Sequence, residues 1–160
     1  MGNEYQLTIN STDDISRMLA EAERLGIAYD YYNACIYLRG ASGTSIDAGE
    51  ALKGLYVVAE GAAIVHVREG ASVIAEGSAT VHVHDDSSTV ARSRATVYAH
   101  DSALVTLEDQ SSVYVTSDDV EVLAQDDSTV YLPAEKSAGA GPIVELRDSA
   151  EVIRTSVPSN

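Results

Sequence analysis

A short pattern of alternating apolar and polar residues repeats through the middle of the chain. From position 55 to 132, each unit reads apolar, any residue, valine, any residue, apolar, and then a polar turn. The central residues are eight apart, with one-residue slips near Ser88 and Asp119, and they are Val57, Val65, Val73, Val81, Val90, Val97, Val105, Val113, Val122 and Val130. An octad is too short for a helical repeat. Alternation over about five residues, closed by Gly, Asp or Ser, predicts a short strand and a tight turn.

A second period, in the residue that follows each central valine, predicts how the strands stack. In one set of alternate strands this outward residue is aromatic or imidazole: His66, His82, Tyr98, Tyr114 and Tyr131. In the other set it is aliphatic or small: Val58, Ile74, Ala91, Thr106 and Leu123. The two sets never mix, so one coil is two octads of about 16 residues, with equivalent side chains about 4.8 Å apart. The pattern therefore predicts an all-β fold, a parallel β-solenoid (β-helix) with two strands per coil.

The first slip has a local interpretation. The stretch Asp85-Asp86-Ser87-Ser88-Thr89-Val90 matches residues 126–130 with one extra serine. We therefore expect a bulge at this point, which keeps Val90 inside the solenoid and turns Ala91 outward.

The remaining segments are expected to close the two ends of the solenoid. Residues 1–33 predict an N-terminal cap: a strand through Tyr5, Leu7 and Ile9, and a helix that begins at Ser11 or Thr12 and ends at Gly26. Such a cap would cover backbone groups that could otherwise recruit other chains. The solenoid is predicted over 34–154, with regular octads at 55–132, a loop at 133–141, a last coil at 142–154 and a tail at 155–160.

The composition indicates the compartment in which the protein works and the kind of partner it binds. The 160-residue chain has a formal net charge of −15 and one cysteine, Cys35, which excludes an internal disulfide. It has no apolar stretch of about 20 residues and no basic and apolar leader, so we expect a cytoplasmic protein without a membrane span. The charge argues against direct binding of nucleic acid or an anionic membrane, and favours a basic protein partner.

The acidic residues concentrate in the predicted turns. Residues 55–132 carry 13 acids and 3 bases, and the acidic edges include Asp85, Asp86, Asp101, Asp118, Asp119, Glu76 and Glu108. This is about one net charge per 2.4 Å at the strand spacing, against about one per 1.7 Å in duplex DNA. A DNA-mimicking inhibitor of a basic nucleic-acid-binding protein is therefore one hypothesis, and solvated turns are the commoner explanation. Arg92 and Arg94 are expected to relieve repulsion beside Glu76 and Glu108.

Two outward surfaces predict protein binding. The aromatic set His66, His82, Tyr98, Tyr114 and Tyr131 suits a protein interface, although stacked side chains of one kind also support neighbouring strands directly. The aliphatic set, which includes Val58, Ile74, Thr106 and Leu123, suggests a dimer that buries it. The prediction is a non-enzymatic scaffold that self-associates through one solenoid face.

Other chemistry finds less support in the sequence. His82 and His84 flank Val83, and His66 and His100 lie one coil to either side, which could hold zinc, but polar residues at ladder and edge positions explain them more simply. Calcium at the Asp-Asp turns and an ice-binding threonine column are weaker alternatives, and a carbohydrate-active or metal-dependent enzyme is a remote one. No cofactor or metal site is predicted.

The octads also resemble known repeats. Ala79-Thr80-Val81-His82-Val83, Ala95-Thr96-Val97-Tyr98-Ala99 and Ala103-Leu104-Val105 are similar to the Ala-x-Val-x-Ala repeats of uncharacterised bacterial and phage proteins with β-helical architecture. The resemblance covers about half of the chain. It implies a β-helix and an origin in a mobile element, and it supplies no activity and no functional residue. The octads look less like the bactofilin cytoskeletal solenoids, whose repeats are richer in large aliphatic residues and glycine.

Overall fold

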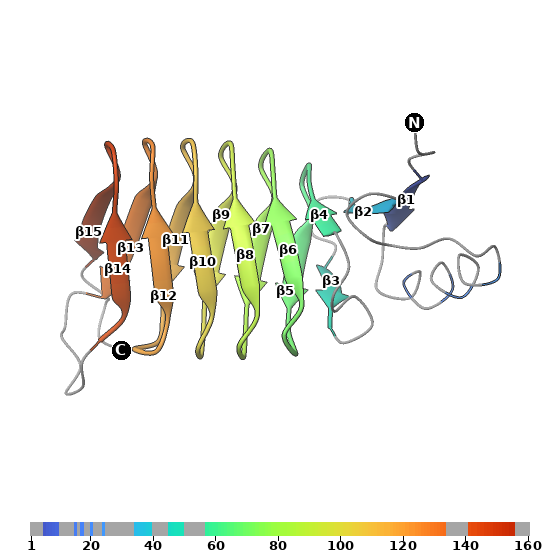
Figure 1. Cartoon of the computed structure of the whole chain (residues 1–160), viewed down its shortest axis with the longest axis horizontal. Coiled ribbons are helices and arrows are strands. Elements are labelled where there is room, and N and C mark those ends of the chain that lie inside the picture. Colours follow the sequence, from blue (N-terminus) through green and yellow to red (C-terminus); the bar gives the residue numbers. More distant parts are fainter. Residues whose placement is uncertain are drawn as a thin grey trace.

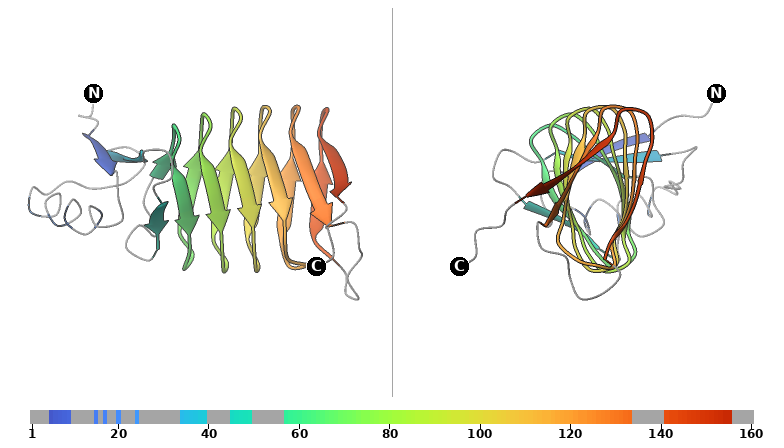
Figure 2. Two further views of the ribbon diagram at one scale, coloured as in Figure 1. Left: turned by 180° about the vertical axis from the view of Figure 1, so that it is seen from behind. Right: turned by 90° about the vertical axis from the view of Figure 1, so that its left-hand side faces the viewer.

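The chain forms a parallel β-solenoid of about five turns with about 16 residues per coil. The computed structural model describes residues 5–9, 15, 17, 20, 24, 34–39, 45–49, 57–133 and 141–155. Seen from the side, the coils stand next to one another with one sheet in front and one behind (Figure 1). Seen along the coil axis, they superpose as a flattened loop (Figure 2). The fold predicted from the octads is therefore confirmed.

Each coil contributes one strand to each of two parallel sheets. Sheet A consists of Tyr5–Ile9 (β1), Ala34–Leu38 (β2), Val57–Ala59 (β4), Ser72–Ala75 (β6), Ser88–Ala91 (β8), Leu104–Leu107 (β10), Glu121–Ala124 (β12) and Ile143–Leu146 (β14). Sheet B consists of Ser45–Ala48 (β3), Ile64–Val67 (β5), Thr80–Val83 (β7), Thr96–Ala99 (β9), Ser112–Val115 (β11), Thr129–Pro133 (β13) and Glu151–Thr155 (β15).

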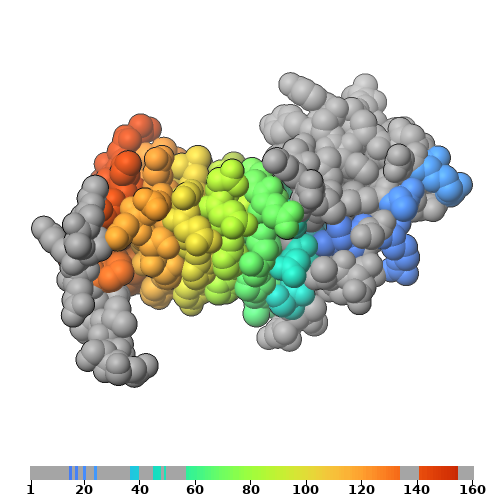
Figure 3. Space-filling view, turned by 90° about the horizontal axis from the view of Figure 1, so that it is seen from below, coloured from blue at the N-terminus to red at the C-terminus, as the bar shows by residue number. Residues whose placement is uncertain are grey.

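The core is thin and made of small side chains. In the second regular coil Ala63, Val65 and Val67 face inward from one side, and Ala71, Val73 and Ala75 face inward from the other; each is at most 1% exposed. Valine and alanine let two sheets approach closely, and the sequence contains no Phe or Trp. The described coils pack as a continuous stack of bands (Figure 3), and the register places like inward residues of successive coils next to one another, as with Val65 and Val81.

The tight turns place their first residue in the left-handed region. Asp85 has φ of 56°, Asp101 of 51° and Asp109 of 55°, and Gly61 and Gly77 occupy the same position in other turns. Most residues avoid this conformation, but Gly has no Cβ and Asp tolerates it because its short side chain can form local hydrogen bonds. The turn geometry thus favours Gly and Asp at this position, although Glu69 and Ser93 also occupy it, with φ of 57° and 58°.

The predicted bulge at Ser88 is wrong. Strand β8 pairs with β6 and β10 at an unbroken 16-residue spacing, with Thr89 opposite Val73 and Val105. Thr89 and Ala91 therefore point inward, at 2% and 0% exposed, and Val90 points outward, the reverse of the prediction. The slip near Asp119 is confirmed, because one extra residue lies in the turn between β11 and β12.

The two ends match the prediction only in part. The strand through Tyr5 is confirmed as β1, which pairs with β2 and extends sheet A. The predicted helix lies outside the described residues, apart from four single positions, so the helical cap stays a prediction; among these positions Ile15 is buried in the core. The last coil is confirmed as β14 and β15, which pair with β12 and β13. The preceding loop lies mostly outside the described part.

Candidate binding surfaces

The aromatic ladder, His66, His82, Tyr98, Tyr114 and Tyr131, runs along the outside of sheet B. Consecutive members are register partners, which confirms the predicted column. Neighbouring ring centroids are 4.5–5.1 Å apart and the ring planes lie within 16° of parallel. Because each ring face is covered by the next ring, the ladder presents mainly ring edges and polar tips to a partner.

A second column of polar side chains lies beside the histidine end of this ladder. Arg68, His84, His100 and Thr116 each directly follow a strand of sheet B. The His84 and His100 rings stack at 4.6 Å. Together with His66 and His82 they form a two-by-two group, called here the histidine block.

Hydrogen bonds connect the two columns of the histidine block. His66 Nδ1 lies 3.4 Å from His84 Nε2, and His82 Nδ1 lies 3.5 Å from His100 Nε2. His100 Nδ1 is 2.8 Å from Thr116 Oγ1, which in turn donates to the Ala99 carbonyl at 2.9 Å. Sequence reasoning placed these residues near one another, but it did not predict the pairing between coils.

Three histidines of the block, His66, His82 and His84, have a lowered pKa. Burial lowers the pKa of His82 from 6.5 to about 4, and nearby His66, His100 and His84 lower it further because two positive rings repel. Burial is also the main cause of the lowered pKa of His66 and His84. At neutral pH these three imidazoles are therefore neutral, and each can donate through one nitrogen and accept through the other.

The outside of sheet A carries the aliphatic strip: Val58, Ile74, Val90, Thr106 and Leu123. Register pairs align these residues on five consecutive strands of the sheet. Val90 replaces Ala91 in this column, so the strip is more continuously aliphatic than the sequence analysis predicted. Val58 is only 4% exposed, and the other four are partly exposed. Leu104, on the adjacent outward position of β10, is 48% exposed.

A ladder of compensating charges borders this strip. Arg92 Nε lies 2.9 Å from Glu108 Oε2, and Arg92 Nη1 lies 3.6 Å from Glu76 Oε1. Arg39 pairs with Glu60 at the N-terminal end of the same column. The predicted relief of repulsion is thus confirmed for Arg92, which bridges two coils.

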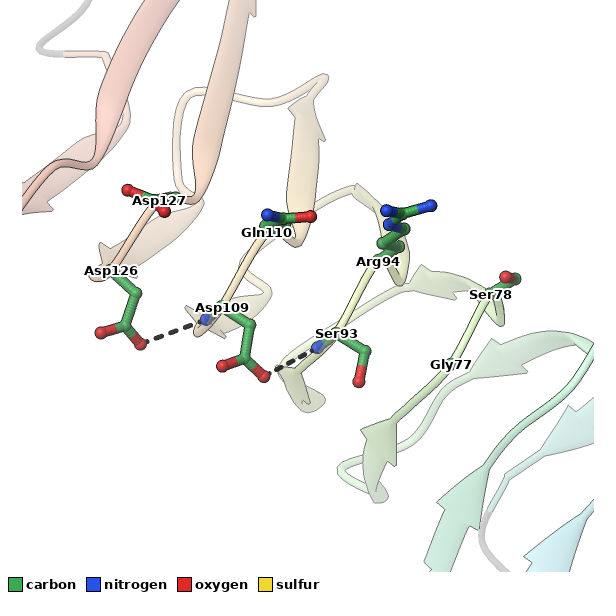
Figure 4. Close-up of a pocket in the computed structure, with 8 residues that line it drawn as sticks. All are labelled: Gly77, Ser78, Ser93, Arg94, Asp109, Gln110, Asp126 and Asp127. Atoms are coloured by element: carbon green, nitrogen blue, oxygen red, sulfur yellow. Dashed lines mark hydrogen bonds between the residues drawn. The ribbon is translucent and has the colours of Figure 1, made fainter.

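The acidic turns form hydrogen-bonded aspartate ladders along both edges. The Asp101 carboxylate accepts from the Asp85 amide at 3.1 Å, and the Asp85 carboxylate accepts from the Glu69 amide at the same distance. On the opposite edge Asp126 accepts from the Asp109 amide, and Asp109 accepts from the Ser93 amide (Figure 4). Each carboxylate therefore stabilises the turn one coil earlier, a structural role that the sequence analysis did not assign to it.

The edge shown in Figure 4 is also hollowed. An open groove of about 530 Å³ runs along these turns, lined by Gly77, Ser78, Ser93, Arg94, Asp109, Gln110, Asp126 and Asp127. Asp86, Asp118 and Asp119, from the predicted acidic edges, are exposed at turn positions.

The described residues lack two features of other classes of protein. Within this part of the chain no three or more His, Cys, Asp or Glu side chains form a group that could hold a metal ion. No helix in the described part is long and apolar enough to cross a membrane.

No family model matches the chain, and neither a curated protein nor a solved structure is detectably similar to it.

Proposed function

We propose that this chain is a protein-binding scaffold that associates with a second copy of itself through the aliphatic strip of sheet A. The observation that carries the proposal is the continuity of the partly exposed strip over four consecutive strands, from Ile74 to Leu123, with the 48% exposed Leu104 beside it. Covering such a strip removes apolar surface from water, which is the main driving force of protein association.

The charge distribution supports this face as the place of contact. The chain carries a net charge of −15, which opposes association of two copies through the acidic edges. Beside the strip, by contrast, Arg92 compensates Glu76 and Glu108, and Arg39 compensates Glu60. Two copies can therefore approach through sheet A with little net repulsion.

The same charges favour one arrangement of the dimer. A twofold axis parallel to the coil axis lays strip on strip and brings the charge ladder of one copy over the Ser72 and Ser88 flank of the other. An axis along the strands would instead bring ladder against ladder, with like charges opposed. We therefore expect two copies whose coil axes run in the same direction.

The test is the mass of the protein in solution. One chain is 16.9 kDa, and light scattering coupled to size exclusion should give twice that value for the unmodified protein. Ile74→Glu places a charge within the exposed strip and should give a monomer. The matched control is Thr80→Glu, on the outward face of sheet B, which should leave the dimer intact. An unmodified protein that stays monomeric at high concentration, or an Ile74→Glu variant that stays dimeric, would refute the proposal.

The DNA-mimic hypothesis remains the second candidate, favoured by carboxylates that recur on successive coils along both edges. The aspartate ladders weaken it, since Asp85 and Asp101 are explained by the hydrogen bonds they accept. Its test should therefore neutralise Asp86, Asp118 and Asp119, for which the exposed position leaves the solenoid intact. Mimicry predicts salt-sensitive binding to core histones that the triple Asp→Asn variant loses; equal binding by the variant would exclude these carboxylates as the mimic.

A further inference from the structure

The histidine block has a geometry that simple stacking does not require. In the pair of His66 and His84 the ring centres are 5.7 Å apart and the facing nitrogens 3.4 Å apart. The distance between the ring centres exceeds the distance between the nitrogens by about one imidazole ring diameter. Each nitrogen therefore lies on the line that joins the ring centres, and the two nitrogens face each other. The pair of His82 and His100 repeats this arrangement one coil further on, at 5.8 Å and 3.5 Å.

Thr116 fixes the tautomer of one of these rings. Its hydroxyl hydrogen is donated to the Ala99 carbonyl, so Thr116 Oγ1 must accept the hydrogen of His100 Nδ1. Neutral His100 therefore carries its proton on Nδ1 and presents a free lone pair on Nε2. With a hydrogen on Nδ1, His82 donates to this lone pair. With its hydrogen on Nε2 instead, His82 leaves the lone pair of His100 free and presents a second lone pair on its own Nδ1.

This arrangement is the one that a metal-binding histidine requires. A ligating imidazole usually donates its second N–H to a neighbouring oxygen, which holds the ring and its lone pair in place. Thr116 supplies that oxygen to His100. Two imidazole nitrogens bound at 2.0–2.1 Å to a tetrahedral ion lie about 3.3–3.4 Å apart, close to the separations in both pairs.

We propose that the histidine block binds a divalent transition-metal ion of the class that prefers imidazole, Zn²⁺ or Cu²⁺, between His82 Nδ1 and His100 Nε2. The pair of His66 and His84 forms a second, weaker chelate of the same geometry. Each ion takes two protein nitrogens and completes its shell with water. This agrees with the absence of any convergent group of three or more ligands among the described residues.

Binding requires only small movements in the block. Because the paired nitrogens point at each other, both rings must tilt so that their lone pairs meet at an ion displaced toward solvent. The rings lie on the outside of sheet B and are partly exposed, so the tilt disturbs no core contact. Arg68 opposes a positive charge at His66, His82 and His84, and Asp47 and Asp101 offset it in part at His66 and His84. Charge therefore does not separate the two pairs. The His82 and His100 pair is the stronger site because Thr116 holds the His100 ring through a hydrogen bond.

The test uses tag-free protein and Zn²⁺ alone, measured by isothermal titration calorimetry. We expect micromolar binding at the His82 and His100 pair, which His100→Ala weakens at least tenfold and Thr116→Val, which removes the oxygen that holds His100, weakens severalfold. Tyr98→Phe, which neighbours His82 in the ladder, is the matched control and should bind as the unmodified protein does. Circular dichroism of the metal-free variants establishes that the solenoid is intact.

A spectroscopic measurement distinguishes a chelate from scattered surface histidines. Electron paramagnetic resonance of the Cu²⁺-loaded His66→Ala variant, which retains only the His82 and His100 pair, should show two coordinated imidazole nitrogens per ion, falling to one when His100→Ala is added. Zn²⁺ binding no tighter than in a variant with all four histidines replaced, or a Cu²⁺ spectrum with one nitrogen in the His66→Ala variant, would overturn the proposal.

Discussion

Replacing Thr89 with valine should stabilise the protein. Thr89 is 2% exposed and occupies an inward column in which its neighbours on both sides are Val73 and Val105. Its hydroxyl has no hydrogen-bond partner among the described residues. The other three buried hydroxyls differ: Ser87 accepts from the Gly70 amide, Ser111 donates to the Glu108 carbonyl with the Ala91 carbonyl also in reach, and Ser128 donates to the Gln125 carbonyl. Thr89 is thus a valine position occupied by a polar group.

The magnitude follows from the burial of that hydroxyl. A buried polar group without a partner costs about 1–3 kcal/mol, and valine has nearly the shape of threonine, so it creates neither a cavity nor a clash. Thr89→Val should therefore raise the free energy of unfolding by about 1–3 kcal/mol. With a urea dependence of about 2 kcal/mol per molar, the unfolding midpoint should rise by about 0.5–1.5 M.

The assay is urea unfolding followed by far-ultraviolet circular dichroism, with the slope of the transition compared between variants because repeat proteins can depart from two-state behaviour. Thr96→Val, on the outward face of β9 and away from the aliphatic strip, is the control and should change stability by less than about 0.5 kcal/mol. The reverse substitution, Val105→Thr, should destabilise by an amount similar to the gain from Thr89→Val. A midpoint for Thr89→Val at or below that of the unmodified protein would show that the hydroxyl is satisfied and the reasoning is wrong.

Two further predictions concern the edges and the histidine block. Asp101→Ala should lower the free energy of unfolding by about 1–3 kcal/mol, because the Asp85 amide loses a charged acceptor and alanine disfavours a positive φ. The control, Asp86→Ala, should change the urea midpoint little. Equal effects of the two substitutions would exclude a ladder role for Asp101. In metal-free protein, stability should fall as pH decreases from about 6.5 toward 4, because the pKa of His82 is lowered to about 4 in the folded state and the unfolded chain binds the proton first. His82→Tyr should reduce this loss of stability at low pH. If the variant and the unmodified protein show the same pH profile of the urea midpoint, protonation of His82 is not the cause of the loss.

The sequence was sufficient for the coil length and the outward columns because both follow from strict periodicity. A strand alternates its side chains with a period of two, and a column of like residues at every sixteenth position has no other simple explanation. The assignment of His82 and Tyr98 to one column needed no knowledge of side-chain conformation. It needed only the register, which the repeated valines fix.

The sequence misled at Val90 because hydrophobicity and backbone register disagree there. Keeping Val90 inside would require one extra residue in the turn that holds Asp85, at the cost of the hydrogen bond from its amide to Asp101. It would also move Arg92 away from Glu76 and Glu108. Several inter-coil interactions together outweigh the cost of burying one threonine hydroxyl, so the register is kept and the polar residue goes inside.

The histidine pairing shows what periodicity alone cannot specify. By sequence, His84 belongs with His82, two residues away on the same side of one strand. In the structure the His84 ring centre is 6.4 Å from that of His82 but 5.7 Å from that of His66, one coil earlier. Side chains lean along the strand as they leave the sheet, and this lean decides which nitrogen meets which. A motif of two histidines around one valine would therefore suggest the wrong pair of ligands. If the block binds metal as proposed, His82→Ala should impair the site shared with His100 and leave the one between His66 and His84.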